Sequence, residues 1–185
     1  MKLLRVNPKG SWALRDKPPI AATGMGGLEV RKAAERGNIF DHHSVVYEYD
    51  DGARHFHQCR QMTSCGRDVS THLWGTKGYS HVEKYLIKDP EGNTSWSYKG
   101  EKNIMHQTEH DEFFAALRAG KTINDGEYMC RSTMLAILGR MAAYSGQRVT
   151  WDQAINSKED LSPANYNFGP FPTPKVAVPG VYKVF

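Results

Sequence analysis

The feature that most constrains the fold is a hairpin pattern in "SVVYEYDDGARHFHQCRQM", residues 44–62. Two runs of alternating character, over residues 45–49 and 53–62, flank the pair Asp51-Gly52. This pair is typical of a tight hairpin turn, because glycine adopts positive φ at no steric cost. The period of two places alternate residues on opposite faces. Val45, Tyr47 and Tyr49 share one face of the first strand, and His55, His57 and Cys59 share one face of the second.

Further strands are expected on both sides of this hairpin. The segments "PPIAATGMGG", "DVSTHLWG", "YSHVEKYLI" and "TSWSY" are rich in β-branched and aromatic residues or bounded by turn residues. With the hairpin they give about six strands, joined mostly by short turns. Short connections of this kind favour an antiparallel sheet.

The second half of the chain changes to helical patterns. "EHDEFFAALRAGK", residues 109–121, has acids in its expected first turn, basic residues in its last and Gly120 as a natural cap. A longer helix is expected after Asn124 or Asp125 and up to Gly146. A short helix follows Thr150, and residues 161–185 are expected to be extended because they are rich in proline. The buried face of the long helix is predicted from apolar residues at helical spacing, namely Met134, Ile137, Leu138, Met141 and Ala142.

Strands followed by helices indicate the fold class. The order predicts an α+β fold, with an open-faced, mainly antiparallel β-sheet and helices packed on one face. A chain of 185 residues, 39% hydrophobic and 24% charged, suits one globular domain with a real core.

Composition also excludes several classes of function. The net charge of +4 is mild, and no run of lysine and arginine follows a phosphate backbone, so no nucleic-acid partner is expected. No apolar run reaches the roughly 18 residues that cross a bilayer, and the N-terminus does not resemble a secretory signal. Three cysteines without metal-ligand spacing favour reduced thiols. A cytoplasmic protein without a membrane partner is therefore expected.

The glycine cluster in "IAATGMGGLEV", residues 20–30, raises the question of a nucleotide-binding loop. The dinucleotide fingerprint needs glycines at its first, third and sixth positions, between a strand and a helix. Counting from Gly24, the third position is Gly26 but the sixth is Glu29. The following "RKAAERGNIF" is too short and too broken for the crossover helix. The stretch is expected to turn the chain and not to hold a pyrophosphate.

Two groups of residues, a set of histidines and one cysteine, could supply metal binding or catalysis. His42, His43, His55 and His57 could supply a metal site, since residues two apart on a strand share a face. A ladder of histidines on a half-exposed sheet is the simpler explanation, because no carboxylate or cysteine stands at a recognised ligand spacing, so no metal ligand is assigned. Cys65 could be considered as a nucleophile, but no helix is expected to begin directly after it, where the helix N-terminus would lower the pKa of the thiol. No catalytic residue is assigned either.

The sequence resembles a known family in four segments: "WALRDKPPIAATGMGG", "GNIFDHHSVVYEYDDGARHFHQCRQM", "GTKG" and "HDEFFAALRAGK…NDGEYMCRSTMLAILGRMAAYSGQRVTWDQ". They resemble the C-terminal domain of the Gfo/Idh/MocA (glucose–fructose oxidoreductase / inositol dehydrogenase) family. The resemblance assigns residues 12–160 to a substrate-binding and oligomerisation domain, leaving a non-matching segment at 1–11 and an extended tail at 161–185. It implies an NAD(P)-dependent oxidoreductase of sugars or polyols, with an N-terminal Rossmann domain and an open-faced sheet.

The chain differs from that family in lacking the segments that carry the family's catalytic residues. The Rossmann domain and the family's Glu-Lys-Pro motif have no counterpart, and "MKLLRVNPKGS" stands where a histidine-containing helix is expected. The chain is therefore expected to be catalytically incomplete and to hold no cofactor by itself, with NAD(P) implied only for the full-length family. It could be part of a longer protein, a shortened gene product or one half of a split protein.

Residues expected to line the substrate side lie at the start and end of the hairpin: Asp41, His42, Arg60 and Gln61. They could present polar groups to the hydroxyls of a sugar or polyol, and an arginine can fork onto a carboxylate or a hydroxyl-rich ligand. For Arg60 an ion pair with a neighbouring acid is the open alternative. Expected partners are copies of the chain in a homo-oligomer and a separate Rossmann-domain protein. The alternative function is a stand-alone, non-enzymatic binding or assembly module that oligomerises through its open sheet face.

Overall fold

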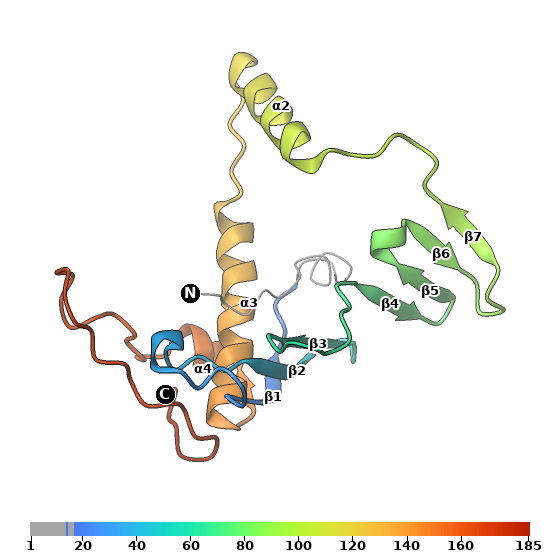
Figure 1. Cartoon of the computed structure of the whole chain (residues 1–185). Coiled ribbons are helices and arrows are strands. Elements are labelled where there is room, and N and C mark those ends of the chain that lie inside the picture. Colours follow the sequence, from blue (N-terminus) through green and yellow to red (C-terminus); the bar gives the residue numbers. More distant parts are fainter. Residues whose placement is uncertain (1–13, 15–16) are drawn as a thin grey trace. The chain divides into compact units, whose positions relative to one another are not determined.

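A computed structural model describes Leu14 and residues 17–185 of the chain (Figure 1). The chain divides into two compact units, one formed by Met1–Arg67 and Arg131–Phe185 and the other by Asp68–Cys130. Each unit contains one four-stranded antiparallel sheet. The α+β class with antiparallel sheets is thus confirmed. The proposed segment at residues 1–11 lies outside the described residues.

The sheet of the first unit has the strand order β3-β2-β1-β8. Its strands are β1 (Ala21–Gly27), β2 (His42–Glu48), β3 (Arg54–Arg60) and β8 (Val149–Thr150). The predicted hairpin is β2 and β3, and Gly52 adopts φ 87° in the turn between them. The loop between β1 and β2 contains the short 3-10 helix η1 (Ala34–Arg36).

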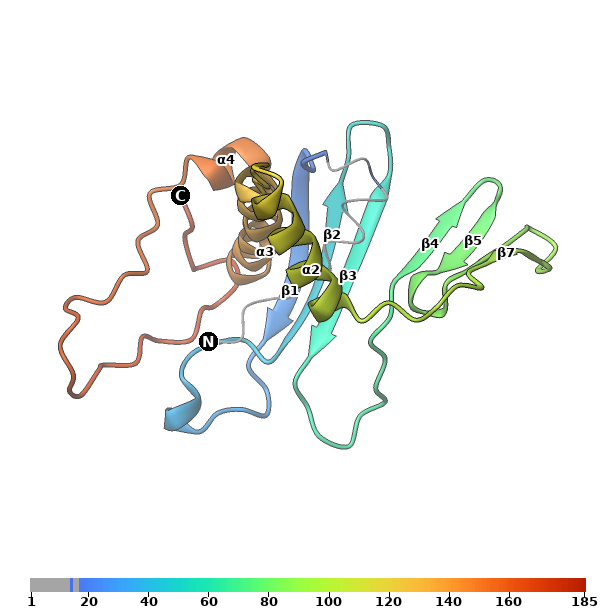
Figure 2. The ribbon, with the colours of Figure 1, turned by 90° about the horizontal axis from the view of Figure 1, so that it is seen from above.

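Helix α3 (Gly126–Ser145) packs its C-terminal half against one face of this sheet (Figure 2). The hydroxyl of Tyr47 in β2 donates to the carbonyl oxygen of Leu135 over 3.0 Å. As predicted, Leu138, Met141 and Ala142 are buried, and Met134 and Ile137 pack against the edge of the core. The core also contains Ala22, Val45, Tyr47, Tyr49, Leu135, Val149, Ala154 and Val184.

The glycine cluster belongs to a strand and not to a turn, which corrects the sequence-based expectation. Gly24, Gly26 and Gly27 all lie in β1. A Cβ at position 24 would lie 3.2 Å from the backbone nitrogen of Ala143 in α3. A Cβ at position 26 would lie 2.4 Å from the carbonyl oxygen of His42. Glycine here permits the close approach of β1 to α3 and to β2.

The remaining parts of the first unit follow the predicted order. The short helix α4 (Trp151–Ile155) begins after Thr150, whose hydroxyl accepts from the backbone nitrogen of Gln153 in a reciprocal capping box. Residues 161–185 contain no helix or strand, as expected. The end of this tail returns to the body, because Ala177 and Val184 are buried.

The second unit has the sheet order β4-β5-β6-β7, with β4 (His72–Gly75), β5 (Gly78–His81), β6 (Leu86–Lys88) and β7 (Thr94–Ser97). The single strand expected over residues 79–87 is divided by the 3-10 helix η2 (Val82–Lys84), after which Tyr85 adopts φ 52°. The strands therefore form two sheets where the sequence suggested one. Among the described residues, no helix combines the length and apolar character needed to cross a membrane.

Helix α2 (Met105–Arg118) belongs to the second unit and begins four residues before the expected start. Its acids consequently lie beyond the first turn, which corrects the expected arrangement of charge at its N-terminus. Gly120 follows it with φ 66°, as a C-terminal glycine should. Its apolar residues Phe113, Phe114 and Leu117 remain about half exposed.

Candidate functional site

Asp41 is the centre of the candidate site, just before β2. The residue is 3% exposed. Its Oδ2 atom accepts three consecutive backbone N–H groups, from Glu29 at 2.9 Å, Val30 at 2.7 Å and Arg31 at 3.0 Å. The loop after β1 therefore folds around this one carboxylate oxygen.

The other carboxylate oxygen of Asp41 orients His42. Oδ1 lies 2.8 Å from His42 Nδ1. Burial acts to raise the pKa of Asp41, but the bond with His42 and the three backbone donors outweigh it and lower the pKa to about 2. Since an ionised carboxylate only accepts, Nδ1 of His42 carries the hydrogen. When the imidazole is neutral, its lone pair is then on Nε2, and the side chain is 41% exposed.

The strand register places His42 between Gly27 of β1 and Arg60 of β3. Residues paired in this way share one face of the sheet. A Cβ at position 27 would lie 3.2 Å from His42 Cε1, so glycine at this position leaves room for the imidazole ring. This row lies on the face of the sheet opposite α3.

Gln61 and two arginines complete the group. The backbone nitrogen of Gln61 donates to the carbonyl oxygen of Asp41 over 2.7 Å. Arg31 Nη1 donates to Gln61 Oε1 over 3.2 Å, and Arg60 Nη2 donates to the carbonyl oxygen of Gly66 over 2.9 Å. The structure thus brings together all four residues chosen from the sequence and adds Arg31. These five residues, Arg31, Asp41, His42, Arg60 and Gln61, are called the Asp41 cluster below.

Sequence reasoning missed Arg31 because no motif connects it to the hairpin. It follows β1 and reaches the cluster only because its own N–H group is bound by Asp41. A buried aspartate ten residues later along the chain gives no sequence sign of such a bond. The assignment of the cluster to substrate binding stays a prediction.

The other histidines of the hairpin lie on the face toward α3. His43, which is 8% exposed, pairs with Cys59, and Val45 pairs with His57. His42 points to the opposite face, so the four imidazoles considered for a metal site do not converge. Within the described residues, no group of three or more histidine, cysteine or acidic side chains is placed to hold a metal ion.

Burial explains the protonation state of the histidines on the α3 side. It lowers the pKa of His43 to about 4, helped by Coulomb interactions with His42, His57 and Arg140 and opposed by Asp41. Burial also lowers the pKa of His57 to about 4 and that of His55 below its usual value. These side chains are neutral at pH 7 and belong to the interior of the unit.

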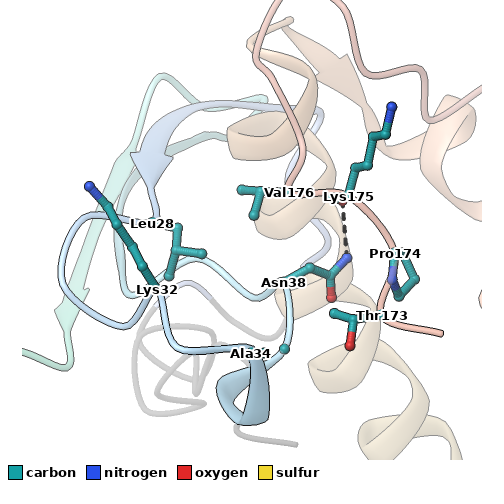
Figure 3. Close-up of a pocket in the computed structure, with 9 residues that line it drawn as sticks. Leu28, Lys32, Ala34, Asn38, Thr173, Pro174, Lys175 and Val176 are labelled. Atoms are coloured by element: carbon teal, nitrogen blue, oxygen red, sulfur yellow. Dashed lines mark hydrogen bonds between the residues drawn. The ribbon is translucent and has the colours of Figure 1, made fainter. Parts of the chain in front are cut away.

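A separate cavity of about 440 Å³ lies between the loop after β1 and the tail (Figure 3). Asn38 Nδ2 donates to the carbonyl oxygen of Lys175 over 3.3 Å beside it. The side chains of Lys32 and Lys175 point away from the cavity (Figure 3). No residue of the Asp41 cluster lines it. Its walls consist of Leu28, Lys32, Ala34, Gly37, Asn38, Thr173, Pro174, Lys175 and Val176.

The glycine stretch does not have the geometry of a Rossmann-type dinucleotide site. The glycines that prompted the question are paired within an antiparallel sheet, where Gly24 faces Val45 and Gly27 faces His42. A pyrophosphate site of the Rossmann type needs a glycine turn that opens a helix after a parallel strand. Both described sheets are antiparallel throughout. No step of a reaction is therefore assigned to such a cofactor here.

Comparisons with known proteins place the fold. No family model matches the chain. A search of curated proteins likewise gave no match. Solved structures do match.

An oxidoreductase from Agrobacterium radiobacter, in complex with NAD+, L-tartaric acid and magnesium, aligns with a TM-score of 0.54 and 16% identity over 73% of this chain and 44% of its own. A protein from Thermotoga maritima designated an oxidoreductase aligns with a TM-score of 0.56 and 16% identity. The alignment covers 76% of this chain and 42% of the other. A protein from Sinorhizobium meliloti designated a myo-inositol dehydrogenase aligns with a TM-score of 0.52 and 17% identity. The alignment covers 76% of this chain and 46% of the other.

These similarities show a shared fold. At this level of identity they do not transfer an activity. The chain spans less than half the length of each of these structures. It therefore corresponds in fold to a part of proteins described as oxidoreductases and dehydrogenases.

Proposed function

We propose that this chain is the substrate-binding and oligomerisation part of an NAD(P)-dependent oxidoreductase that acts on sugars or polyols. The fold it shares with part of several oxidoreductases supports this proposal, as does its resemblance to the C-terminal domain of the Gfo/Idh/MocA family. One matched structure contains NAD+ and the polyhydroxylated L-tartaric acid. The nicotinamide-binding part lies outside the residues described for this chain.

One observation carries the proposal, namely the His42 imidazole, a side chain 41% exposed whose Nδ1 is held by the buried Asp41, which leaves Nε2 as the acceptor of the neutral ring. This acceptor stands in the same row as the guanidinium donors of Arg60. Ligand hydroxyls are both donors and acceptors, so an acceptor and donors presented on one face can bind a polyol. Because both oxygens of Asp41 are occupied, Asp41 acts by positioning its neighbours.

The binding part of the proposal is tested by titrating the chain with myo-inositol and following backbone amide signals by NMR. We expect shifts confined to the Asp41 cluster and a dissociation constant at least tenfold weaker in His42→Ala. Ser44→Ala is the control, because Ser44 lies one row away on the same face of β2. Failure of myo-inositol, glucose and sorbitol to shift any signal would contradict polyol binding.

The catalytic part needs a second protein. Mixing this chain with a separate Rossmann-domain protein should restore NAD(P)-dependent oxidation of a polyol, measured by absorbance of the reduced nicotinamide. The chain alone should neither bind NAD(P) nor turn over a sugar. Turnover by the chain alone would contradict this division of roles.

A second candidate function, a non-enzymatic assembly module, is favoured by the sheet face opposite α3. Met25 and Phe56 on this face are 72% and 70% exposed. Exposed apolar side chains that share a face often mark interfaces. A homo-oligomer that Phe56→Glu dissociates in analytical ultracentrifugation, together with no polyol binding, would support the module over the enzyme part.

A further inference from the structure

The arginines of the first unit differ in their partners. Arg148 binds the carboxylate of Glu48 through two bonds, Nε at 3.0 Å and Nη2 at 2.8 Å. Arg140 is paired with Glu159. Among the described residues, Arg31 and Arg60 instead donate to neutral oxygens, those of Gln61 and Gly66, and have no carboxylate partner.

One buried acid binds both Arg31 and the residue that follows Arg60. Asp41 binds the backbone N–H of Arg31, and its carbonyl oxygen accepts the N–H of Gln61, which directly follows Arg60. The Arg31 side chain then returns to the Gln61 amide. The four N–H groups that surround the Asp41 carboxylate occupy both of its oxygens. Its side chain is also fully buried, and among the described residues it makes no bond to either guanidinium.

The cluster thus presents two kinds of group. In the neutral imidazole of His42, Nε2 is a hydrogen-bond acceptor suited to a hydroxyl donor. Arg31 and Arg60 retain N–H donors that no protein carboxylate takes, and a guanidinium fork matches a carboxylate in geometry and charge. A neutral polyol would use the acceptor but would leave the charge of both guanidinium groups unmatched.

We infer that the ligand of the Asp41 cluster is a polyhydroxy acid, whose carboxylate binds Arg31 and Arg60 and whose hydroxyl donates to His42. This inference rests on the proposed function and specifies the substrate class of the same site. It places the specificity for the acid in the two arginines. Arg31 has this role although no motif in the sequence points to it.

The test compares two compounds that differ only in charge at one end, D-gluconate and D-gluconamide. Isothermal titration of the full chain at low salt and pH 7.5 should give a dissociation constant at least tenfold lower for gluconate. Arg60→Gln and Arg31→Gln should each reduce gluconate binding to the level of gluconamide. Added sodium chloride should reduce the preference, because salt screens exposed charges.

Arg54→Gln is the matched control. Arg54 lies on the same strand and face as Arg60, at the opposite end of β3, and it also donates to backbone carbonyl oxygens. This variant should keep the tenfold preference. If Arg60→Gln does not fold, as judged by circular dichroism, Arg60→Lys retains the charge without the fork and should retain only part of the preference.

The outcomes separate this inference from the proposed function. Equal affinity for gluconate and gluconamide overturns the inference and leaves polyol binding in place. A gluconate preference that persists in both arginine variants also overturns it, because the charge would then be bound elsewhere. Binding of neither compound overturns the inference, and the proposed function falls with it only if myo-inositol, glucose and sorbitol also fail to bind.

Discussion

Single residues at the N-terminal end of β2 decide what the site can do. Asp41 has the environment of a structural residue: it is buried, ionised and fully hydrogen-bonded. Its structural bonds nevertheless fix the direction of an exposed imidazole and the position of Arg31. Removal of this one carboxylate would therefore affect both stability and binding.

Asp41→Asn provides a first test at the residue scale. The amide Nδ2 cannot accept, so either His42 or the three backbone donors lose their partner. We expect a loss of about 2 kcal/mol in the free energy of unfolding, the usual range for hydrogen bonds to a charged group. Chemical denaturation measures the loss. Asp51→Asn is the control, because Asp51 is exposed and its carboxylate accepts only the N–H of Ala53; an equal loss in both variants would contradict the special role of Asp41.

The second residue-scale prediction concerns Gly24. A Cβ there meets the backbone nitrogen of Ala143 and Cγ2 of Val45, each at 3.2 Å. Gly24→Ala should lower the free energy of unfolding by about 1–3 kcal/mol, as overpacking of a core does. Gly75→Ala in β4 is the matched control, since its Cβ would lie 3.9 Å from the carbonyl oxygen of Gly78. Equal stability of the two variants would show that β1 and α3 are not in contact at this point.

The third prediction is a pH dependence set by the histidines buried on the α3 side. The folded pKa of His43 and of His57 is about 4, below the unfolded value near 6.5. Between these values the unfolded chain binds more protons, so the free energy of unfolding should fall as the pH drops from 6.5 to 4.

Urea denaturation at pH 7, 6 and 5 measures this slope. His43→Gln should make this slope shallower, because the variant lacks one of the groups that bind a proton in the unfolded state but not in the folded state. His106→Gln replaces an exposed histidine and is the control. A slope that is unchanged in His43→Gln would contradict the burial of a neutral imidazole at this position.

At the scale of elements, the tail contributes to the core although it contains no helix or strand. Val184 is 2% exposed and belongs to the main core cluster. The carbonyl oxygen of the same residue accepts from the Ser157 hydroxyl. Gly180 donates to the carbonyl oxygen of Ser145 over 2.7 Å, at the end of α3. The tail thus attaches at the C-terminal end of the helix that covers the sheet.

This arrangement predicts unequal effects for two identical substitutions in the tail. Val184→Ala should lower the free energy of unfolding by about 2 kcal/mol, because it removes two buried methyl groups and leaves a cavity. Val181→Ala removes the same groups from a residue that is 73% exposed, and should change the stability by less than about 0.5 kcal/mol. Thermal or chemical denaturation of both variants distinguishes them. Equal losses would mean that the tail does not pack as described.

At the scale of the whole molecule, the two units differ in how much they bury. All residues of the two buried hydrophobic clusters belong to the first unit. In the second unit, where every residue from 68 to 130 is described, none is buried. Segments with few buried contacts open locally at little cost in free energy.

Amide hydrogen exchange should therefore separate the units. We expect the amides of β1, β2 and the C-terminal half of α3 to exchange at least a hundredfold more slowly than those of β4, β5, β6 and β7. The expected cause is local opening of a sheet without a buried core. Mass spectrometry of peptides after exchange measures the difference. Similar protection in both units would show that the second unit is stabilised by contacts beyond its own chain segment.

Much of the fold could be predicted from local patterns, and the role of the candidate site residues stays a prediction. The hairpin of β2 and β3, the extent of α3, the capped start of α4 and the extended tail are all confirmed. Each depends on neighbours within a few residues, which a single sequence displays. The wrong predictions concern features that depend on contacts between distant segments. These are the interruption of a strand by η2 and the division of the strands into two sheets.

By itself, the sequence determined the class of the fold, the position of the hairpin and the choice of Asp41, His42, Arg60 and Gln61 as candidates, because alternation and turn residues are local properties of the chain. Only the tertiary structure decided that β1 carries glycines to approach α3, that His42 and His43 face opposite sides, and that Arg31 joins the cluster. These features depend on contacts between segments far apart in the sequence. Such contacts are set by packing and by which polar groups find a partner, and no local pattern records them.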